Sequence, residues 1–443
     1  MRRALHATRS TTLSVPRLSR KRPLHVYSHG EGFLGALGHG DFSPRAEALP
    51  VAALASKDVQ CVSAGWTHSA AVCRDGEVLV WGRPFDLKQP LRVNRIQRVM
   101  PLLVTAINAF ASSKEVLPSP VSAPTTTPAA ATPTTTITPA SSEAASPASP
   151  TAPPLLRAKS VACSAALTVV LDHDGRVYCM GYNRWGQCGQ GPKNVFTIFE
   201  PLRVGGRALE HERVTSLAVG FQQVLVLCES GKVFGWGKGL RGQLGIGCEM
   251  IELPVPVELP GKVVDLRSGF SHAVAVLENG DVYIWGRMQG TKVKTDARVP
   301  VYEDQLYPRK VEIAGGGRAV EAFCSSFNTL LRMDDGRMMM FGLEADTKKT
   351  VHSPVEVDIP ASQPGAFFSG FNDTIVRTDG DPQSPLPSST STPGSAGASH
   401  QFHRITFTSE GASVSPYVLP GLAMDSRVEA VSVGWKHTVA LVR

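Results

Sequence analysis

Three histidines stand in the same local sequence, and histidine is the side chain that most often acts as a base or a metal ligand near neutral pH. They are His68 in GWTHSAAV, His272 in GFSHAVAV and His437 in GWKHTVAL. A catalytic or metal-binding set needs its side chains in one place. Because each histidine occupies the same position of a separate repeated unit, we expect the three to lie one unit or more apart. Each should bond to backbone near the start of a strand, which predicts structural roles.

Other residues with chemical potential lack the partners that chemistry requires. Gly35–Gly40 looks superficially like a phosphate-cradling loop, but no helix with Lys-Ser/Thr follows it. The eight cysteines are scattered, without a CxxC pair or a histidine at ligand spacing, so we expect reduced, buried thiols. No G-x-S-x-G nucleophile motif stands out. We therefore predict no catalytic, cofactor-binding or metal-binding residue and no cofactor, and we expect the protein not to be an enzyme.

The elements that position these residues follow from an internal repeat. A small residue is followed eleven residues later by a two-residue turn ending in Gly, and six residues after that by a closing Gly. Five segments share this spacing without insertion or deletion: 62–82, 161–181, 217–237, 266–286 and 322–342.

Each unit has the pattern of a central antiparallel hairpin. Ala273–Leu277 is a short apolar run typical of a buried strand, Asn279-Gly280 is a hairpin turn, and Val282–Trp285 is the return strand. The segments between units should supply the two outer strands of a four-stranded sheet. The large residue before each closing Gly should pack between neighbouring sheets. We interpret all six tryptophans as core rather than as a binding aromatic box: Trp66, Trp81, Trp185, Trp236, Trp285 and Trp435.

Two weaker units bring the count to seven. One starts at Phe368 and leads to Asp379-Gly380, and the other, Val431–Leu441, repeats only the first half of the unit. The missing half stands at the other end of the chain, where Val26–Gly30 matches Val282–Gly286 with His29 in the Trp position. Terminal strands that share one sheet would close a ring and remove exposed edges.

Two tracts interrupt the repeat period. Successive closing glycines lie 49 to 56 residues apart, except for 99 residues between Gly82 and Gly181. Residues 112–156 and 381–399 are rich in Pro, Ser, Thr and Ala and should be disordered surface insertions. Asn94–Phe110 has apolar residues at helical spacing, interrupted by Pro101, so it predicts a helix packed on the rim or facing a partner.

The net charge of +7 resides in the first 30 residues, which hold seven Arg or Lys and no acid. The rest of the chain is formally neutral, which argues against strong direct binding of nucleic acid. Residues 1–24 have the Arg-rich, Ser/Thr-rich composition of a mitochondrial transit segment, and a disordered basic tail or a nuclear signal at Arg20–Arg22 is the alternative. No apolar stretch is long enough for a membrane span.

The repeated signature resembles that of the regulator-of-chromosome-condensation repeat family. The resemblance rests on the three histidine segments and on the loops GALGHGD (35–41), WGQCGQG (185–191) and RGQLGIG (241–247). It implies an all-β, seven-bladed β-propeller with four-stranded antiparallel blades, formed by residues 25–443, with the terminal strands sharing one blade. The family histidine is replaced at other units by Leu167, Gln223, Asn328 and Asp373, which weakens transfer of any particular binding surface.

Three functions are consistent with this family and this composition. The first is a non-catalytic interaction scaffold of the mitochondrial matrix, with mitochondrial ribosomal or RNA-processing proteins as partners. The second is guanine-nucleotide exchange on a small or organellar GTPase, although the 112–156 insertion has too few charged and aromatic residues to form a good wedge. The third, a nuclear or cytoplasmic chromatin- or DNA-binding propeller, is disfavoured by the neutral body. We expect a monomer.

Overall fold

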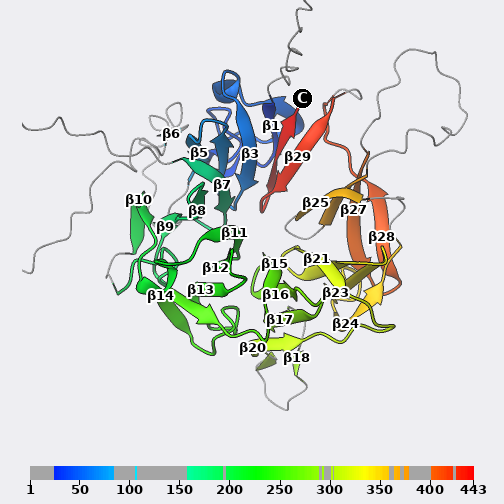
Figure 1. The fold of residues 1–443 in the computed structure, drawn as a ribbon. Coiled ribbons are helices and arrows are strands. Elements are labelled where there is room, and N and C mark those ends of the chain that lie inside the picture. Colours follow the sequence, from blue (N-terminus) through cyan, green and yellow to red (C-terminus); the bar gives the residue numbers. More distant parts are fainter. Residues whose placement is uncertain are drawn as a thin grey trace, which may run out of the picture.

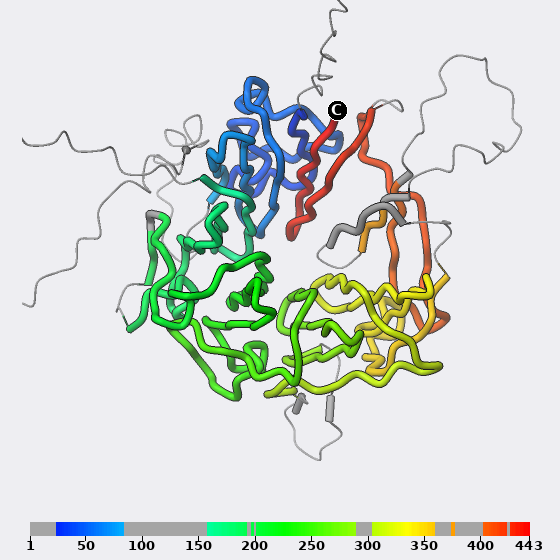
Figure 2. The backbone as a smooth tube through the Cα atoms, viewed as in Figure 1, coloured from blue at the N-terminus to red at the C-terminus, as the bar shows by residue number. Residues whose placement is uncertain are grey.

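The computed structural model describes residues 24–83, 105–106, 157–192, 196–288, 292–293, 301–302, 304–358, 364–369, 374–378, 401–422 and 426–443. These residues form seven four-stranded antiparallel sheets arranged in a ring (Figure 1). The backbone passes once round the ring, so that its blue and red ends lie side by side (Figure 2). The predicted seven-bladed propeller with four-stranded blades is confirmed.

Six blades use consecutive parts of the chain, and the seventh uses both ends. The first three consecutive blades are β3 (Val59–Ala64), β4 (His68–Cys73), β5 (Val78–Gly82) and β6 (Thr105–Ala106); β7 (Ala158–Cys163), β8 (Leu167–Asp172), β9 (Val177–Tyr182) and β10 (Thr197–Arg203); and β11 (Val214–Val219), β12 (Gln223–Cys228), β13 (Val233–Lys238) and β14 (Met250–Val257). The next three are β15 (Val263–Ser268), β16 (His272–Leu277), β17 (Val282–Gly286) and β20 (Gln305–Lys310); β21 (Ala319–Cys324), β22 (Asn328–Met333), β23 (Met338–Leu343) and β24 (Thr350–Glu356); and β25 (Pro364–Ser369), β26 (Thr374–Thr378), β27 (Gln401–Thr408) and β28 (Gly411–Pro416). The shared blade has the order β2-β1-β30-β29, with β1 (His25–Gly30), β2 (Arg45–Pro50), β29 (Val428–Val433) and β30 (His437–Val442).

A few short elements complete the described chain. A two-stranded hairpin, β18 (Lys292–Val293) with β19 (Val301–Tyr302), precedes β20. Single 3₁₀ turns occur at η1 (Phe33–Gly35), η2 (Ala52–Leu54) and η5 (Arg207–Leu209). No helix among the described residues is long and apolar enough to cross a membrane.

The β16–β17 hairpin shows why the repeat folds as it does. Every residue of β16 is buried, because blades lie against both faces of the sheet, and this explains the continuous apolar run. Gly280 has φ +87° in the turn, and the Leu277 N–H donates to the Asp281 carbonyl at 2.9 Å. The closing Gly286 has φ +91°, and a Cβ there would collide with the Ser271 carbonyl. The repeated Gly positions are thus steric requirements.

The two chain ends meet in one sheet as predicted. β1 pairs antiparallel with β30 from His25 opposite Val442 to Gly30 opposite His437. β30 also pairs with β29, while β1 pairs with β2, so both ends lie at the middle of a complete blade. The pairing joins the first and last parts of the chain and closes the ring.

Large residues before the closing glycines fill the spaces between blades. Trp236 lies in one buried cluster with the apolar residues of β8 and β9, and Trp285 lies in another with those of β12 and β13. Both side chains are fully buried. Each Trp Nε1 donates to a loop carbonyl of the preceding blade, that of Gln187 at 3.0 Å and that of Gln243 at 3.1 Å respectively. One side chain therefore joins the apolar core to the neighbouring loop.

Some predictions outside the repeat need correction or lie beyond the described residues. Thr105–Ala106 form β6, the outer strand beside β5, so the predicted helix over 94–110 is wrong at these two positions. The other residues of that segment, the tracts 112–156 and 381–399, and the leader up to residue 23 lie outside the described chain. Five cysteines are buried as expected and Cys61 and Cys163 partly so, but Cys248 is exposed on the loop after β13.

Candidate functional site

The antiparallel topology separates the ring into two faces. In each consecutive blade the loops after the first and third strands emerge on one side, which we call the loop face. The turns between the second and third strands and the connections between blades emerge on the other side, which we call the turn face. In the β11–β14 blade, residues 220–222 and 239–249 belong to the loop face, whereas 229–232 belong to the turn face.

Aromatic side chains from the innermost loops gather at the axis on the loop face. The ring centroids of Trp66 and Phe221 are 4.7 Å apart, those of Trp66 and Trp435 5.3 Å, and those of Phe221 and Phe270 4.5 Å. Phe327 continues the series, 5.9 Å from Phe270. We call these five residues the mouth cluster. It adjoins a cavity of about 270 Å³, lined by the ends of six innermost strands: β3, β7, β11, β15, β21 and β29.

The mouth cluster corrects the interpretation of the tryptophans. Trp81, like Trp236 and Trp285, is core as predicted. Trp435 is 38% exposed, and Trp66 is only partly buried, so these two line an accessible surface. The remaining tryptophan, Trp185, is also partly buried and lies under the ammonium of Lys238. Three tryptophans are therefore surface residues of the loop face.

The small residue at position four of each unit holds the innermost loops together. A Cβ on Gly65 would lie 2.6 Å from the Ser164 carbonyl, and one on Gly269 would lie 2.6 Å from the Ser325 carbonyl. Gly434 abuts the Gly65 carbonyl in the same way. Neighbouring loops also share backbone hydrogen bonds, such as that from the Trp435 N–H to the Gly65 carbonyl at 3.2 Å. This close ring of loops brings the aromatic residues together.

The three histidines occupy the predicted strand starts, but their partners differ from those expected. Nε2 of His68 shares a hydrogen bond with Thr168 Oγ1 at 2.9 Å, and Nε2 of His437 does so with Ser69 Oγ at 2.8 Å. Nε2 of His272 is 3.2 Å from Thr329 Oγ1. Each partner is the hydroxyl at the second residue of the equivalent strand in the next blade. The prediction of a backbone partner is wrong, because the ring brings this hydroxyl to the imidazole.

Burial holds these histidines in their neutral form. Desolvation lowers the pKa of His68 to about 3, with a further contribution from His437. It lowers the pKa of His272 to about 4 and that of His437 to about 4, where His29 adds repulsion. A neutral imidazole bonded to a hydroxyl on the neighbouring blade forms a buried hydrogen bond that links the two blades.

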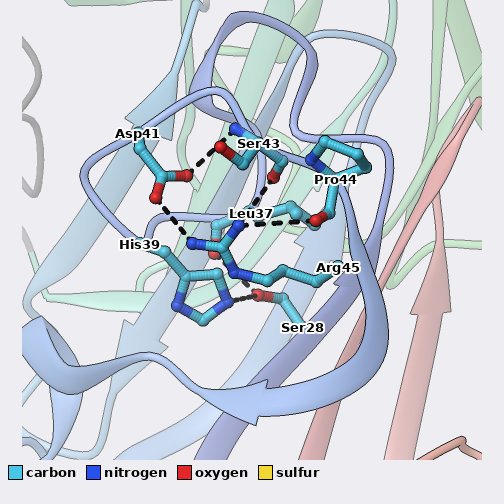
Figure 3. A network of polar contacts seen from close by, with 7 residues as sticks. All are labelled: Ser28, Leu37, His39, Asp41, Ser43, Pro44 and Arg45. Atoms are coloured by element: carbon cyan, nitrogen blue, oxygen red, sulfur yellow. Dashed lines mark hydrogen bonds and ion pairs between the residues drawn. The ribbon is translucent and has the colours of Figure 1, made fainter.

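Besides the bond between Ser69 and His437, Ser28 and His39 form a second serine–histidine contact, whose geometry invites comparison with a nucleophile and its base (Figure 3). His39 Nε2 is 3.0 Å from Ser28 Oγ, but the Ser28 hydroxyl donates to the Leu37 carbonyl at 2.7 Å and is only 1% exposed. Asp41, the nearby acid, forms an ion pair with Arg45 at 2.6 Å. The network fixes the 35–41 loop against β1 and presents no hydroxyl to a substrate.

One group among the described residues has the spacing of a metal site. Cys73, Asp75 and Glu77 place their ligand atoms within 4.8 Å of one another on the turn face. Burial and the neighbouring carboxylates raise the pKa of the Cys73 thiol to about 11, and Lys57 lies 2.6 Å from Glu77. A protonated thiol and a neutralised carboxylate favour a structural ion pair here.

The position-five aromatics are the site residues that sequence reasoning missed. An aromatic follows the small residue in five of the units, at Trp66, Phe221, Phe270, Phe371 and Trp435, of which Phe371 lies outside the described residues. This recurrence is the sequence pattern from which the mouth aromatics could have been predicted. A core aromatic and a mouth aromatic have the same period, so the period alone did not separate them.

Comparison with known proteins agrees with this architecture. The sequence model "Regulator of chromosome condensation (RCC1) repeat" matches residues 25–72, 174–227 and 230–276, and a second model of the same repeat matches 59–86. The Ultraviolet-B receptor UVR8 of Arabidopsis thaliana is 28% identical over 251 residues, which cover 54% of each chain. The "RCC1 domain-containing protein RUG3, mitochondrial" of the same plant is 28% identical over 237 residues, 53% of this chain and 42% of that protein.

A shorter segment of the chain is similar in sequence to a protein named as exchange-factor-like. The "RCC1-like G exchanging factor-like protein" of Mus musculus is 34% identical over 116 residues, 25% of this chain and 24% of that protein. The chain thus spans about half the length, or less, of the curated relatives it matches.

Two solved propellers have the same fold. Human WBSCR16 superimposes with a TM-score of 0.63 at 16% identity, over 95% of this chain and 99% of that one. Prp20p from Saccharomyces cerevisiae superimposes with a TM-score of 0.62 at 16% identity, over 95% and 91%. At this identity the likeness concerns the fold alone. The repeat models match segments from β1 to β16 and seven blades close through the two chain ends, so the chain carries RCC1 repeats within a seven-bladed β-propeller.

Proposed function

We propose that the protein is a non-catalytic interaction scaffold of mitochondria, whose partners are mitochondrial ribosomal or RNA-processing proteins. The observation that carries the scaffold role is the mouth cluster. It places Trp66 and Trp435 at an accessible surface of a rigid ring, beside a cavity of about 270 Å³. Tryptophan and phenylalanine around a hollow are typical of the energetic centre of a protein interface.

The mitochondrial location is supported by two observations. Residues 1–24 have a transit-like composition, and a relative that matches 53% of the chain is named as mitochondrial. Fusion of residues 1–24 to a fluorescent protein tests this proposal. We expect import into mitochondria, and we expect replacement of the arginines by glutamine to leave the fusion in the cytosol. A nuclear signal for the unmodified fusion would contradict the proposed location.

Affinity purification of the tagged full chain from isolated mitochondria, followed by mass spectrometry, tests the choice of partners. Recovery of mitochondrial ribosomal or RNA-processing proteins above a tag-only control is the expected result. Recovery of no protein above that control would contradict the scaffold role.

Guanine-nucleotide exchange is the second candidate, favoured by the 34% identity to a protein named for G exchange. The solved Prp20p is likewise described with binding properties to Gsp1p and histones. An exchange factor would accelerate the release of labelled GDP from an organellar GTPase. Release at the intrinsic rate across candidate GTPases would remove this alternative and leave the scaffold role.

A further inference from the structure

A lysine on the loop face is held by neutral groups. Lys238 Nζ lies 4.6 Å from the centroid of the Trp185 ring and 2.9 Å from Gln222 Oε1. The lysine ends β13, Trp185 comes from the loop of the preceding blade, and Gln222 follows Phe221 of the mouth cluster. The ammonium is therefore fixed between an indole ring and an amide oxygen.

A second cation stands next to this lysine. Arg241 Nη1 donates to Ser271 Oγ at 3.1 Å, which fixes it between the β11–β14 blade and the next blade. Burial and the proximity of Arg241 both lower the pKa of Lys238. Two neighbouring cations, one of them half-desolvated, create a local positive potential that favours a carboxylate.

Apolar side chains continue this surface toward the rim. Leu240 is 41% exposed and Met250, opposite Lys238 across β13 and β14, is 42% exposed. The adjoining β20 presents Tyr307 at 59% exposed, and its Leu306 carbonyl accepts the Gly247 N–H at 3.2 Å. The β13–β14 loop and β20 are thus side by side. We call Trp185, Lys238, Leu240, Arg241, Met250 and Tyr307 the radial strip.

The turn face of the same blade has a different arrangement of charge. Lys232 lies 2.9 Å from Glu212, and Arg213 lies 3.9 Å from Glu229. The connection to the next blade pairs Lys262 with Glu278 at 3.9 Å. These cations have carboxylate partners within the chain, whereas the contacts of Lys238 are an indole and an amide. The contrast points to an external acid as the partner of Lys238.

We propose that the radial strip binds an acidic segment of a partner protein that also carries apolar residues. Carboxylates of that segment bind Lys238 and Arg241, and its apolar side chains pack on Leu240, Met250 and Tyr307. The described loops of this face carry acidic residues nearly as often as basic ones, so a phosphate chain crossing it would meet repulsion. A peptide needs only the two local cations. This inference rests on the proposed scaffold function and names its partner chemistry.

A random peptide library displayed on phage is the first probe, selected on the immobilised full chain. We expect enrichment of peptides that combine Asp or Glu with aromatic or aliphatic residues. A labelled synthetic peptide of the enriched sequence is then titrated by fluorescence anisotropy. Lys238→Glu/Arg241→Glu should weaken its binding by at least about tenfold through charge repulsion. Arg213→Glu/Lys262→Glu makes the same charge change on the turn face and should leave binding unchanged.

Several results would overturn the proposal. One is a library without acidic–apolar enrichment, and another is equal binding of the peptide by the loop-face variant. A twelve-nucleotide oligouridylate serves as the competing probe, and its binding, lost in the same variant, would assign the strip to nucleic acid. Thermal melts show whether each variant is folded before its peptide binding is measured.

The failure of this inference is distinguishable from failure of the scaffold role. If the wild-type chain and the Lys238→Glu/Arg241→Glu variant recover the same mitochondrial partners, the radial strip is excluded while the scaffold role stands. If the wild-type chain recovers none, the scaffold role itself fails.

Discussion

Individual side chains of the repeat act across blade boundaries rather than within one blade. His68, His272 and His437 each bond to a hydroxyl of the next blade. Of the four units that lack this histidine, one has Gln223, whose Nε2 reaches Ser268 Oγ and the Phe270 carbonyl, both at 3.3 Å. In the three histidine units and the Gln223 unit the position holds a polar side chain that bonds to the neighbouring blade, whereas the β7–β10 blade has the buried Leu167 there.

The buried histidines predict an acid-sensitive fold. Their pKa values in the folded state, about 3 to 4, lie below the ordinary value of 6.5, so protonation favours the unfolded chain. Their contribution is complete above pH 6.5 and falls as the pH drops toward 4. Each should add a slope of about 1.4 kcal/mol per pH unit to the free energy of unfolding. Denaturant unfolding measured from pH 7.5 to 4.5 checks this slope.

His272→Gln removes one of these titratable side chains. Glutamine should keep a hydrogen bond to the next blade, because Gln223 occupies the same position in the β11–β14 blade. The variant should lose about one third of the histidine-dependent slope between pH 6 and pH 4.5. A slope equal to that of the wild type would show that the histidine is not kept neutral.

Gly65→Ala tests the close ring of innermost loops. The added Cβ would lie 2.6 Å from the backbone carbonyl of Ser164, so the loops must separate. We expect a loss of about 1–3 kcal/mol in the free energy of unfolding. Gly205→Ala is the matched control, since its Cβ would meet its nearest atom at an ordinary 3.4 Å. Equal stability of the two variants would contradict the steric role of position four.

At the scale of the element, the same repeat carries two classes of aromatic residue. The aromatic before the closing Gly fills the space between sheets, whereas the aromatic after the small residue lies at the mouth. The hairpin turn, the buried strand and the closing Gly could be predicted because all three are local to one unit. The mouth cluster could not, because Trp66 and Phe221 belong to different blades that only the closed ring brings together. The two-residue strand β6 carries too short a pattern to outweigh the helical spacing of 94–110.

Trp285→Ala and Trp435→Ala should separate these classes. Trp285 is fully buried and bonded to the Gln243 carbonyl, so its loss should cost about 3–5 kcal/mol of stability. Trp435 is 38% exposed, and its loss should cost roughly 1–2 kcal/mol. Chemical denaturation of both variants gives the comparison. A larger loss for Trp435 would mean that the mouth cluster is core.

At the scale of the whole molecule, pairing of the two chain ends joins the seven sheets into one closed ring. β30 lies between β1 and β29, so loss of β1 would leave an exposed edge in the middle of a blade. The sequence could predict this closure because Val26–Gly30 and Val431–Leu441 are complementary halves of one unit.

Two truncations test this closure. Removal of residues 1–23 should leave the thermal transition unchanged, because β1 starts at His25. Removal of residues 1–30 should abolish the cooperative transition or cause aggregation. A cooperative melt of the shorter chain at the wild-type temperature would show that the terminal pairing is dispensable.

The central claim is that the loop face holds the partner, and one capture experiment tests it most directly. The tagged wild-type chain, a Trp66→Ala/Trp435→Ala chain and the turn-face variant Arg213→Glu/Lys262→Glu are purified from mitochondria under the same conditions, each after a check of folding. We predict that the partners recovered by the wild type persist with the turn-face variant and are lost with the mouth variant. Retention of the same partners by the folded mouth variant would contradict the account.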